Sequence, residues 1–413
     1  MIPRKRLDIA WADLLFGIKG CLQLESRRVI ERRLERLWSQ ERASLACLSV
    51  RSGFDALLQV FDFEPETEIL VSAITIHGMT RIIEAHGLVP VPIDLDCTQL
   101  AVRSESMAKA VTPRTKAILV AHLFGSHMPM EPILRVAQLH NLIVIEDCAQ
   151  AYAGHQYRGH PQSDVTMFSF GPIKTSTALA GGILQFRDTL LRNAVCAYQN
   201  RWPIHSRLWF LVRICKYALL MALSYRATYR VFVGACSAFN MNHDRLIGNI
   251  VRGFPGNKFF TQIRQRPSSA LLLLLERRLT RFDPGRIVAR IDLAEQLIRL
   301  TSSIRRPGSR ACDHTHWVFP ILCDSPEQLM HSLWRQGFDA TQGGSSLYVL
   351  DPPANCPELY PVAAKQIFQQ LLYLPVHEGM SPQDIERLAN ALNKYDGTQR
   401  TSNRNRLLTS KST

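Results

Sequence analysis

Three segments of the sequence carry side chains that could do chemistry together. The turn Arg51-Ser52-Gly53-Phe54 opens a helical pattern, where backbone N–H groups favour a phosphate. Asp147 ends the very apolar run 142–147, so its carboxylate is desolvated unless a cation lies beside it. Lys174 follows Ser169 in a proline-containing loop. Each segment alone also has an ordinary reading as a plain turn, a helix-capping acid or a surface lysine.

Taken together, the three segments match the needs of one cofactor. Pyridoxal phosphate requires amides and a hydroxyl for its phosphate, a carboxylate beside its pyridine nitrogen and a lysine for its aldehyde. Asp147 and Lys174 are separated by about the length of one crossover, so both can reach the same strand-end crevice. Ala180-Gly181-Gly182 leads into another apolar run, as a backbone close to a ligand requires. The spacing therefore predicts a pyridoxal-phosphate site.

The elements that must position these residues follow from the hydrophobic pattern. Short apolar runs separated by helical patterns lie at 46–50, 68–73, 88–94, 116–123, 142–147, 164–170 and 181–186. This alternation is typical of a mostly parallel sheet covered by helices on both faces. Ligands of such sheets bind beyond the carboxyl ends of the strands, where Asp147 and Ser52 are expected.

The same pattern divides the chain into parts. We expect a helical arm at 1–45, the large α/β domain at 46–198 and an apolar, basic helical insertion at 199–260. Long linking helices at 261–313, a smaller C-terminal α+β domain at 314–395 and a disordered basic tail at 396–413 follow.

Composition and charge bear on the partners. The 413 residues are 46% hydrophobic and 20% charged, which excludes collagen-like and wholly disordered classes. The formal net charge of +14 favours anionic partners such as nucleotides, phosphorylated metabolites or an anionic membrane face. No nucleic-acid-binding module is recognisable, so we expect no nucleic acid. The 10 scattered cysteines form no C-x-x-C pair, which predicts reduced thiols in a cytoplasmic protein without a metal site.

The insertion contains the most apolar segment, 208–223. It is too short to span a bilayer and carries Arg213 and Lys216. Such a helix either packs within the protein or lies in a membrane interface with its basic residues among head groups. Two interpretations of 205–240 therefore remain: packing within the protein, or peripheral contact with the inner membrane surface.

In order and spacing, these segments resemble the DegT–StrS family of fold-type I, pyridoxal-phosphate-dependent sugar aminotransferases. The resemblance runs from about 27 to 393, interrupted at 200–260, and is most specific in VIEDCAQAYAGHQYRG, SDVTMFSF and the following lysine. It implies a seven-stranded, mostly parallel sheet and a homodimer whose sites are completed by the partner subunit. It also implies transfer of an amino group, with glutamate as the expected donor, to a nucleotide-linked keto sugar in cell-surface or secondary-metabolite biosynthesis.

The resemblance also implies a role for individual residues. Lys174 would form a Schiff base with the aldehyde and, once displaced, act as the base that moves a proton. Asp147 would pair with the pyridine nitrogen, and Gln150 would touch the phenolic oxygen of the cofactor. Ser169 and the Ser52–Gly53 turn would hold the phosphate.

Three departures from the family pattern accompany these matches. Phe54 stands where a threonine usually helps to bind phosphate, and Ile76 stands where an aromatic ring usually stacks on the cofactor, with His77 as a substitute. Arg264 replaces a partner-subunit asparagine and is expected to contact the phosphate. The departures leave two alternatives: a non-catalytic regulatory or partner-binding protein of this fold, and an aminotransferase for a lipid-linked or amphipathic keto substrate.

Overall fold

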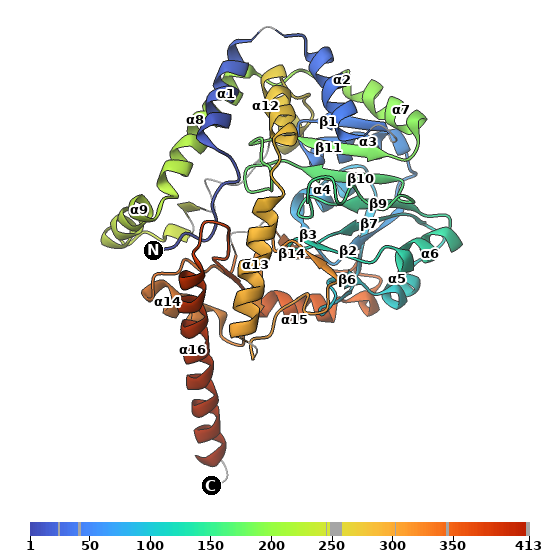
Figure 1. Ribbon diagram of the computed structural model, residues 1–413. Coiled ribbons are helices and arrows are strands. Elements are labelled where there is room, and N and C mark those ends of the chain that lie inside the picture. The colour runs from blue at the N-terminus through green and yellow to red at the C-terminus, as the bar shows by residue number, and fades with distance from the viewer. Residues whose placement is uncertain are drawn as a thin grey trace.

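The computed structural model describes residues 1–23, 25–39, 43–244, 246–247, 258–301, 303–343 and 347–409, with side chains described up to 395. Figure 1 shows a large α/β part, whose sheet lies among helices, and a smaller part that ends in the long helix α16 (Pro382–Thr409). The helices α12 (Ser269–Thr280) and α13 (Gly285–Leu300) run between the two parts.

The large part is built on a seven-stranded sheet in the order β1-β11-β10-β9-β7-β2-β4. The strands are β1 (Ala43–Cys47), β2 (Glu68–Ser72), β4 (Val89–Ile93), β7 (Thr115–Ala121), β9 (Ile143–Asp147), β10 (Val165–Ser169) and β11 (Gly182–Phe186). β11 is antiparallel to both of its neighbours, and the other adjacent pairs are parallel. The predicted sheet is therefore confirmed.

Alternating side chains of the central strands face opposite helical layers. Ile69 and Val71 belong to the core under α3 (Val50–Phe61), α4 (His77–Ala85) and α7 (Thr189–Gln199). Leu70 faces the other core, under α5 (Ser104–Ala110) and α6 (Glu131–Leu139). The period of two along each strand thus covers both faces of the sheet with apolar side chains.

The N-terminal region differs from the predicted helical arm. Its first ten residues form no helix: Ile2 pairs with Phe338, and the backbone and side chain of Arg4 bond to Asp339. Helices α1 (Trp11–Leu22) and α2 (Arg27–Trp38) follow. This segment is fixed by contacts with distant residues, which local periodicity does not reveal.

The described part of the insertion is mainly helical, as predicted, and 245 and 248–257 lie outside the described residues. It contains α8 (Arg207–Leu223) and α9 (Arg226–Ala238), and α8 lies beside α1 (Figure 1). The two helices contact closely at Gly17, where an added Cβ would lie 3.0 Å from Ile214 Cδ1. Among the described residues, no single helix is long and apolar enough to cross a membrane; α8 and α9 reach that length only together and meet at a 93° bend.

The smaller part packs around its own core. Its two-stranded sheet joins β13 (Phe319–Leu322) to β15 (Leu371–Leu374), with α14 (Pro326–Arg335), α15 (Val362–Gln370) and α16 around it. The tail predicted to be disordered from 396 instead continues α16 to Thr409, and 410–413 lie outside the described residues. A formed helix extends at little cost through a stretch without proline.

The remaining elements are short connections. They are β3 (Ile74–Ile76) paired with β14 (Leu347–Val349), β5 (Leu95–Asp96) with β6 (Ala101–Val102), β8 (Ser126–His127) with β12 (Asp313–His314), α11 (Phe259–Ile263) and the 3₁₀ turn η1 (Pro357–Leu359).

Candidate active site

The N-terminus of α3 lies against the sheet at the predicted phosphate position. Ser49 caps it: Ser52 N–H donates to Ser49 Oγ at 3.1 Å, and Gly53 N–H donates to Ser49 O at 3.1 Å. A Cβ on Gly182 would lie 2.7 Å from Val50 N, so only glycine allows this approach. Helix α3 thus starts earlier than predicted, and Ser52 and Gly53 lie in its first turn, where a phosphate is favoured.

The predicted acid and amine converge on one place. Asp147 lies at the carboxyl end of β9, and Lys174 lies in the loop after β10. Burial lowers the pKa of Lys174 to about 8, while the negative charge of Asp147 opposes this shift and the positive charge of Arg51 adds to it. Burial likewise raises the pKa of Asp147, and Lys174 acts in the opposite direction. The two groups are therefore close enough for each to stabilise the charged form of the other.

Ser169 lies beside the lysine loop. Its Oγ accepts a hydrogen bond from Gly171 N–H at 3.4 Å. A Cβ on Gly171 would lie 3.6 Å from Ser169 Oγ and 4.0 Å from Lys174 Cγ, so the hydroxyl and the lysine flank the same glycine. The hydroxyl that is predicted to bind the phosphate therefore lies near the side chain of Lys174.

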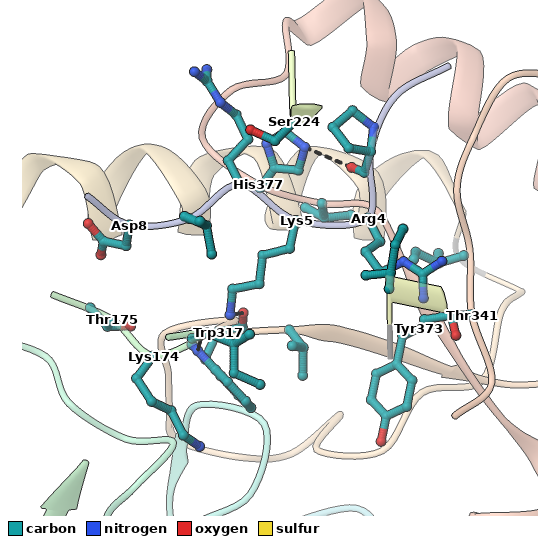
Figure 2. Close-up of a pocket in the computed structure, with 18 of the residues that line it drawn as sticks. Arg4, Lys5, Asp8, Lys174, Thr175, Ser224, Trp317, Thr341, Tyr373 and His377 are labelled. Atoms are coloured by element: carbon teal, nitrogen blue, oxygen red, sulfur yellow. Dashed lines mark hydrogen bonds between the residues drawn. The ribbon is translucent and has the colours of Figure 1, made fainter. Parts of the chain in front are cut away.

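A cavity of about 270 Å³ opens from Lys174. Ile76, Gln150 and Lys174 line it on the sheet side, and residues 3–8 line it on the other. Gln150 is oriented by Phe124 N–H, which donates to its Oε1 at 2.8 Å. Figure 2 shows Lys174, Lys5 and Trp317 grouped in this cavity.

Helices α8 and α9 supply an apolar wall to the same cavity. The wall residues are Leu220, Leu223, Tyr229 and Phe232. Arg213 of α8 donates to Leu179 O at 2.7 Å, which ties this helix to the glycine-containing loop before β11. The insertion therefore packs against the rest of the protein, as one of the two alternatives predicted, and it also lines the site.

Three residues predicted to bind the cofactor lie elsewhere in this chain. Phe54 is fully buried in the core between α3 and the sheet, because the face of α3 that carries it packs inward. His77 is exposed and stacks on Tyr348 at 3.7 Å, so it does not replace the missing aromatic ring in the cavity. Arg264 bonds to Asp55 of α3 at 2.8 and 3.0 Å, and its role toward a partner subunit stays a prediction.

Other residues of the site were missed by reasoning from the sequence. Arg51 lies near both Lys174 and Asp147, and its place in the predicted turn was the available signal. Lys5 and Arg290 line the cavity from segments without any recognisable pattern. Trp317 Nε1 donates to Ile173 O at 3.0 Å and so fixes the loop of Lys174.

A buried polar network supports the strand end that carries Asp147. Glu146 Oε2 lies 2.9 Å from His122 Nε2 and accepts a hydrogen bond from Tyr157 at 2.6 Å. Because Met128 N–H donates to His122 Nδ1, the ring proton lies on Nε2 and points to Glu146. The network is a positioning device for β9, since both Glu146 and His122 are fully buried.

Two histidines near the C-terminal domain lie beside each other in the structure. His314 and His316 stack on each other at 4.1 Å. Burial, together with neighbouring charges, lowers the pKa of His314 to about 2 and that of His316 to about 4. Both imidazoles are therefore neutral near pH 7 and pack against each other.

The donor set fits pyridoxal 5'-phosphate. The capped start of α3 and Ser169 suit its phosphate, Asp147 suits the pyridine nitrogen, and Lys174 suits the aldehyde. The sheet with one antiparallel strand and the lysine in the loop after β10 are typical of the fold of type I aminotransferases.

Comparisons with known proteins narrow this class. Residues 25–202 match the model of the DegT/DnrJ/EryC1/StrS aminotransferase family. GDP-perosamine synthase of Caulobacter vibrioides is 24% identical over 362 residues, which cover 85% of each chain. A UDP-N-acetyl-3-dehydro-alpha-D-glucosamine 3-aminotransferase of Acidithiobacillus ferrooxidans is 36% identical over 156 residues, 36% of this chain and 42% of the relative.

The whole fold also has solved counterparts. An aminotransferase from Streptoalloteichus hindustanus superposes with a TM-score of 0.68 at 18% identity, covering 95% of this chain and 98% of the other. Through residues 25–202 the chain is therefore similar to the DegT/DnrJ/EryC1/StrS aminotransferase family, and its cofactor is pyridoxal 5'-phosphate. Of the two functional classes considered from the sequence, the comparisons support an aminotransferase over a non-catalytic protein.

Proposed function

We propose that this aminotransferase moves an amino group from an amino acid, with glutamate as the donor, to a nucleotide-linked keto sugar. The observation that carries the proposal is that Lys174 lies near Asp147 and lines a cavity large enough for a small molecule. The sugar-modifying activities in the names of the two relatives support the acceptor class. Cell-surface or secondary-metabolite biosynthesis is the setting that we infer.

The residues of the site have separate tasks in such a reaction. When bound, pyridoxal phosphate supplies an electron sink beside the substrate carbon. Lys174, with a pKa of about 8, can take a proton from that carbon and return it, because both of its forms are populated near neutral pH. The negative charge of Asp147 would keep the pyridine nitrogen protonated, and Ser169 would anchor the phosphate.

One experiment tests the reaction directly. The purified protein is incubated with pyridoxal phosphate, ¹⁵N-labelled glutamate and a panel of nucleotide-linked keto sugars, and label in the sugar is measured by mass spectrometry. We expect transfer by the wild type and none by Lys174→Ala, with Lys365→Ala as a control outside the cavity. Unlabelled sugar with every acceptor, or transfer by Lys174→Ala, would overturn the proposal.

A second acceptor class is favoured by the apolar wall of α8 and α9. Leu220, Leu223 and Phe232 offer no hydrogen-bonding side chain, so they suit an alkyl or prenyl chain better than a nucleotide. A lipid-linked or amphipathic keto sugar is therefore the alternative. Including a short-chain lipid-phosphate keto sugar in the same panel distinguishes the two acceptors.

The outer face of the same helices supports work at a membrane surface. The face is formed by Leu15 and Leu22 of α1 and by Leu208, Val212 and Leu219 of α8, each 61% to 77% exposed. The segment 207–238 contains five basic residues and no Asp or Glu. We propose that this α1–α8 face lies on an anionic membrane, at the inner surface in the cytoplasm, because apolar side chains with basic neighbours favour such an interface.

Vesicle sedimentation tests this contact. We expect the protein to pellet with vesicles containing phosphatidylglycerol and to bind far less to pure phosphatidylcholine vesicles. Changing Leu208, Val212 and Leu219 together to Ser should release it, whereas Leu139→Ser with Leu190→Ser, at equally exposed leucines on α6 and α7, should not. If the triple variant instead changed the oligomeric state without affecting vesicle binding, the α1–α8 face would be a subunit contact.

The homodimer remains part of the proposal. Arg264 is 39% exposed at its side chain, so it can reach beyond its pair with Asp55. Light scattering on the eluted protein tests the dimer, and a monomer at micromolar concentration would contradict it.

A further inference from the structure

A second lysine shares the cavity with Lys174. Lys5 Nζ lies 4.0 Å from the centroid of the Trp317 ring and 3.3 Å from Trp317 O. Lys174 Nζ lies 4.3 Å from the centroid of the same ring. Figure 2 shows Lys5 reaching toward Trp317 from the N-terminal segment. The two amines are therefore within reach of one small ligand.

Arg290 of α13 adds a buried cation to the same wall. It is 6% exposed, and its Nε donates to Thr315 O at 2.7 Å. Its Nη2 is buried and has no hydrogen-bond partner among the described residues. Leaving such a donor without an acceptor is costly, so the guanidinium is available to an acceptor that enters the cavity.

The carboxylates nearest to these cations are already engaged. Asp8 accepts hydrogen bonds from Arg278 at 3.1 Å and from Ser176 N–H at 2.9 Å, and it also pairs with Arg286. Glu378 pairs with Arg286 as well. In the described part of the chain, neither Lys5 nor Arg290 forms an ion pair, which leaves both side chains available to an anion in the cavity.

We propose that Lys5 and Arg290 form a subsite for an anionic oxygen group of the substrate, a carboxylate or a phosphate. The inference deepens the proposed function, because it rests on Lys174 as the reacting amine in the same cavity. Two groups of that reaction offer this chemistry: the side-chain carboxylate of a dicarboxylic amino donor and the phosphate of the acceptor. Arg presents paired donors to both groups, and Lys supplies a point charge.

The protonation of Lys5 provides a measurable property of this subsite. Burial lowers the pKa of Lys5 well below its usual range, and Arg290 and Lys174 lower it further. A bound anion acts in the opposite direction and favours the charged amine. Anion binding is therefore accompanied by proton uptake, which a lysine with only a packing role would not produce.

Calorimetry on the cofactor-loaded protein tests the subsite. Glutarate and inorganic pyrophosphate are titrated separately in two buffers of different ionisation enthalpy, and the difference in heat counts the protons taken up. We expect one probe to bind with proton uptake; glutarate would identify the donor carboxylate, and pyrophosphate the acceptor phosphate. Lys5→Met should weaken binding at least tenfold and remove the proton uptake, while Lys216→Met, at an exposed lysine of α8, should change neither.

A conservative variant separates charge from folding. Arg290→Lys keeps the positive charge and should retain binding more closely than Arg290→Gln, with thermal unfolding recorded for both. Binding of neither probe, or unchanged affinity in a folded Lys5→Met protein, would overturn the subsite. Failure of the proposed function would appear separately, as absent amino transfer in a wild-type protein that still binds a probe.

Discussion

The protonation of Lys174 can be shifted in two directions by changing one neighbour at a time. Asp147→Asn removes the negative charge that favours the ammonium form, so the pKa of Lys174 should fall below about 8. Arg51→Met removes a positive charge that disfavours it, so the pKa should rise. Opposite shifts from two isosteric or near-isosteric changes cannot come from a general loosening of the fold.

The magnitude follows from the charges around the amine. The pKa of about 8 lies below the ordinary 10.5, which corresponds to a cost of about 3 kcal/mol for the charged form. An opposite charge close by typically moves a pKa by about 1 to 3 units. Since burial is the largest cause here and the two charges are smaller, we expect roughly one unit in each direction.

The assay uses the cofactor-free protein and a small neutral electrophile. Labelling of Lys174 is followed by mass spectrometry across pH 6 to 11, and the exposed Lys116 is the internal reference. The wild-type midpoint should lie near 8, with the Asp147→Asn midpoint lower and the Arg51→Met midpoint higher. A wild-type midpoint near that of Lys116, or shifts of the two variants in the same direction, would refute the reasoning.

Two further predictions concern stability. In the cofactor-free protein the folded state binds fewer protons at Lys174 than the unfolded state between pH 8 and 10.5, so stability rises across this window. Below it, Lys174→Met should stabilise the protein by up to about 3 kcal/mol in urea unfolding, and a pH-independent difference would contradict this. Gly182→Ala should cost about 1 to 3 kcal/mol and weaken cofactor binding, because the methyl group meets Val50 N at 2.7 Å. Gly234→Ala, where an added Cβ meets nothing within 4 Å, should be neutral or stabilising; equal effects at both glycines would rule out the contact.

The sheet and the acid–amine pair could be predicted because both depend on local pattern. Runs that are apolar on both faces identify buried parallel strands, and the carboxyl end of such a strand locates Asp147. Strand β1 was misplaced by three residues because Ser49 ends the extended segment by capping α3, while the residues after it remain apolar. The same early start of α3 places the side chain of Phe54 in the core between α3 and the sheet.

The rest of the cavity depends on contacts between distant segments. Lys5 is placed by Ile2 and Arg4, which bind Phe338 and Asp339 across almost the whole chain. Arg290 reaches the same wall from the buried side of α13. Lys5 and Arg290 lie far from Lys174 in the sequence, and tertiary packing alone brings them to the same cavity. No local sequence pattern could therefore have predicted that these residues are neighbours.

The two walls of the cavity come from different parts of the chain, which bears on substrate specificity. The groups that would hold the cofactor come from the strand ends and α3, whereas the opposite wall comes from residues 3–8, α8 and α9. We expect changes in α8 and α9 to alter the acceptor without moving Lys174 relative to Asp147, since Trp317 fixes the lysine loop and the buried network of Glu146 supports β9. We therefore expect the apolar α8–α9 wall, beside Lys5 and Arg290, to favour an acceptor that combines an anionic group with an apolar one, whereas the strand ends would carry the amino-transfer chemistry.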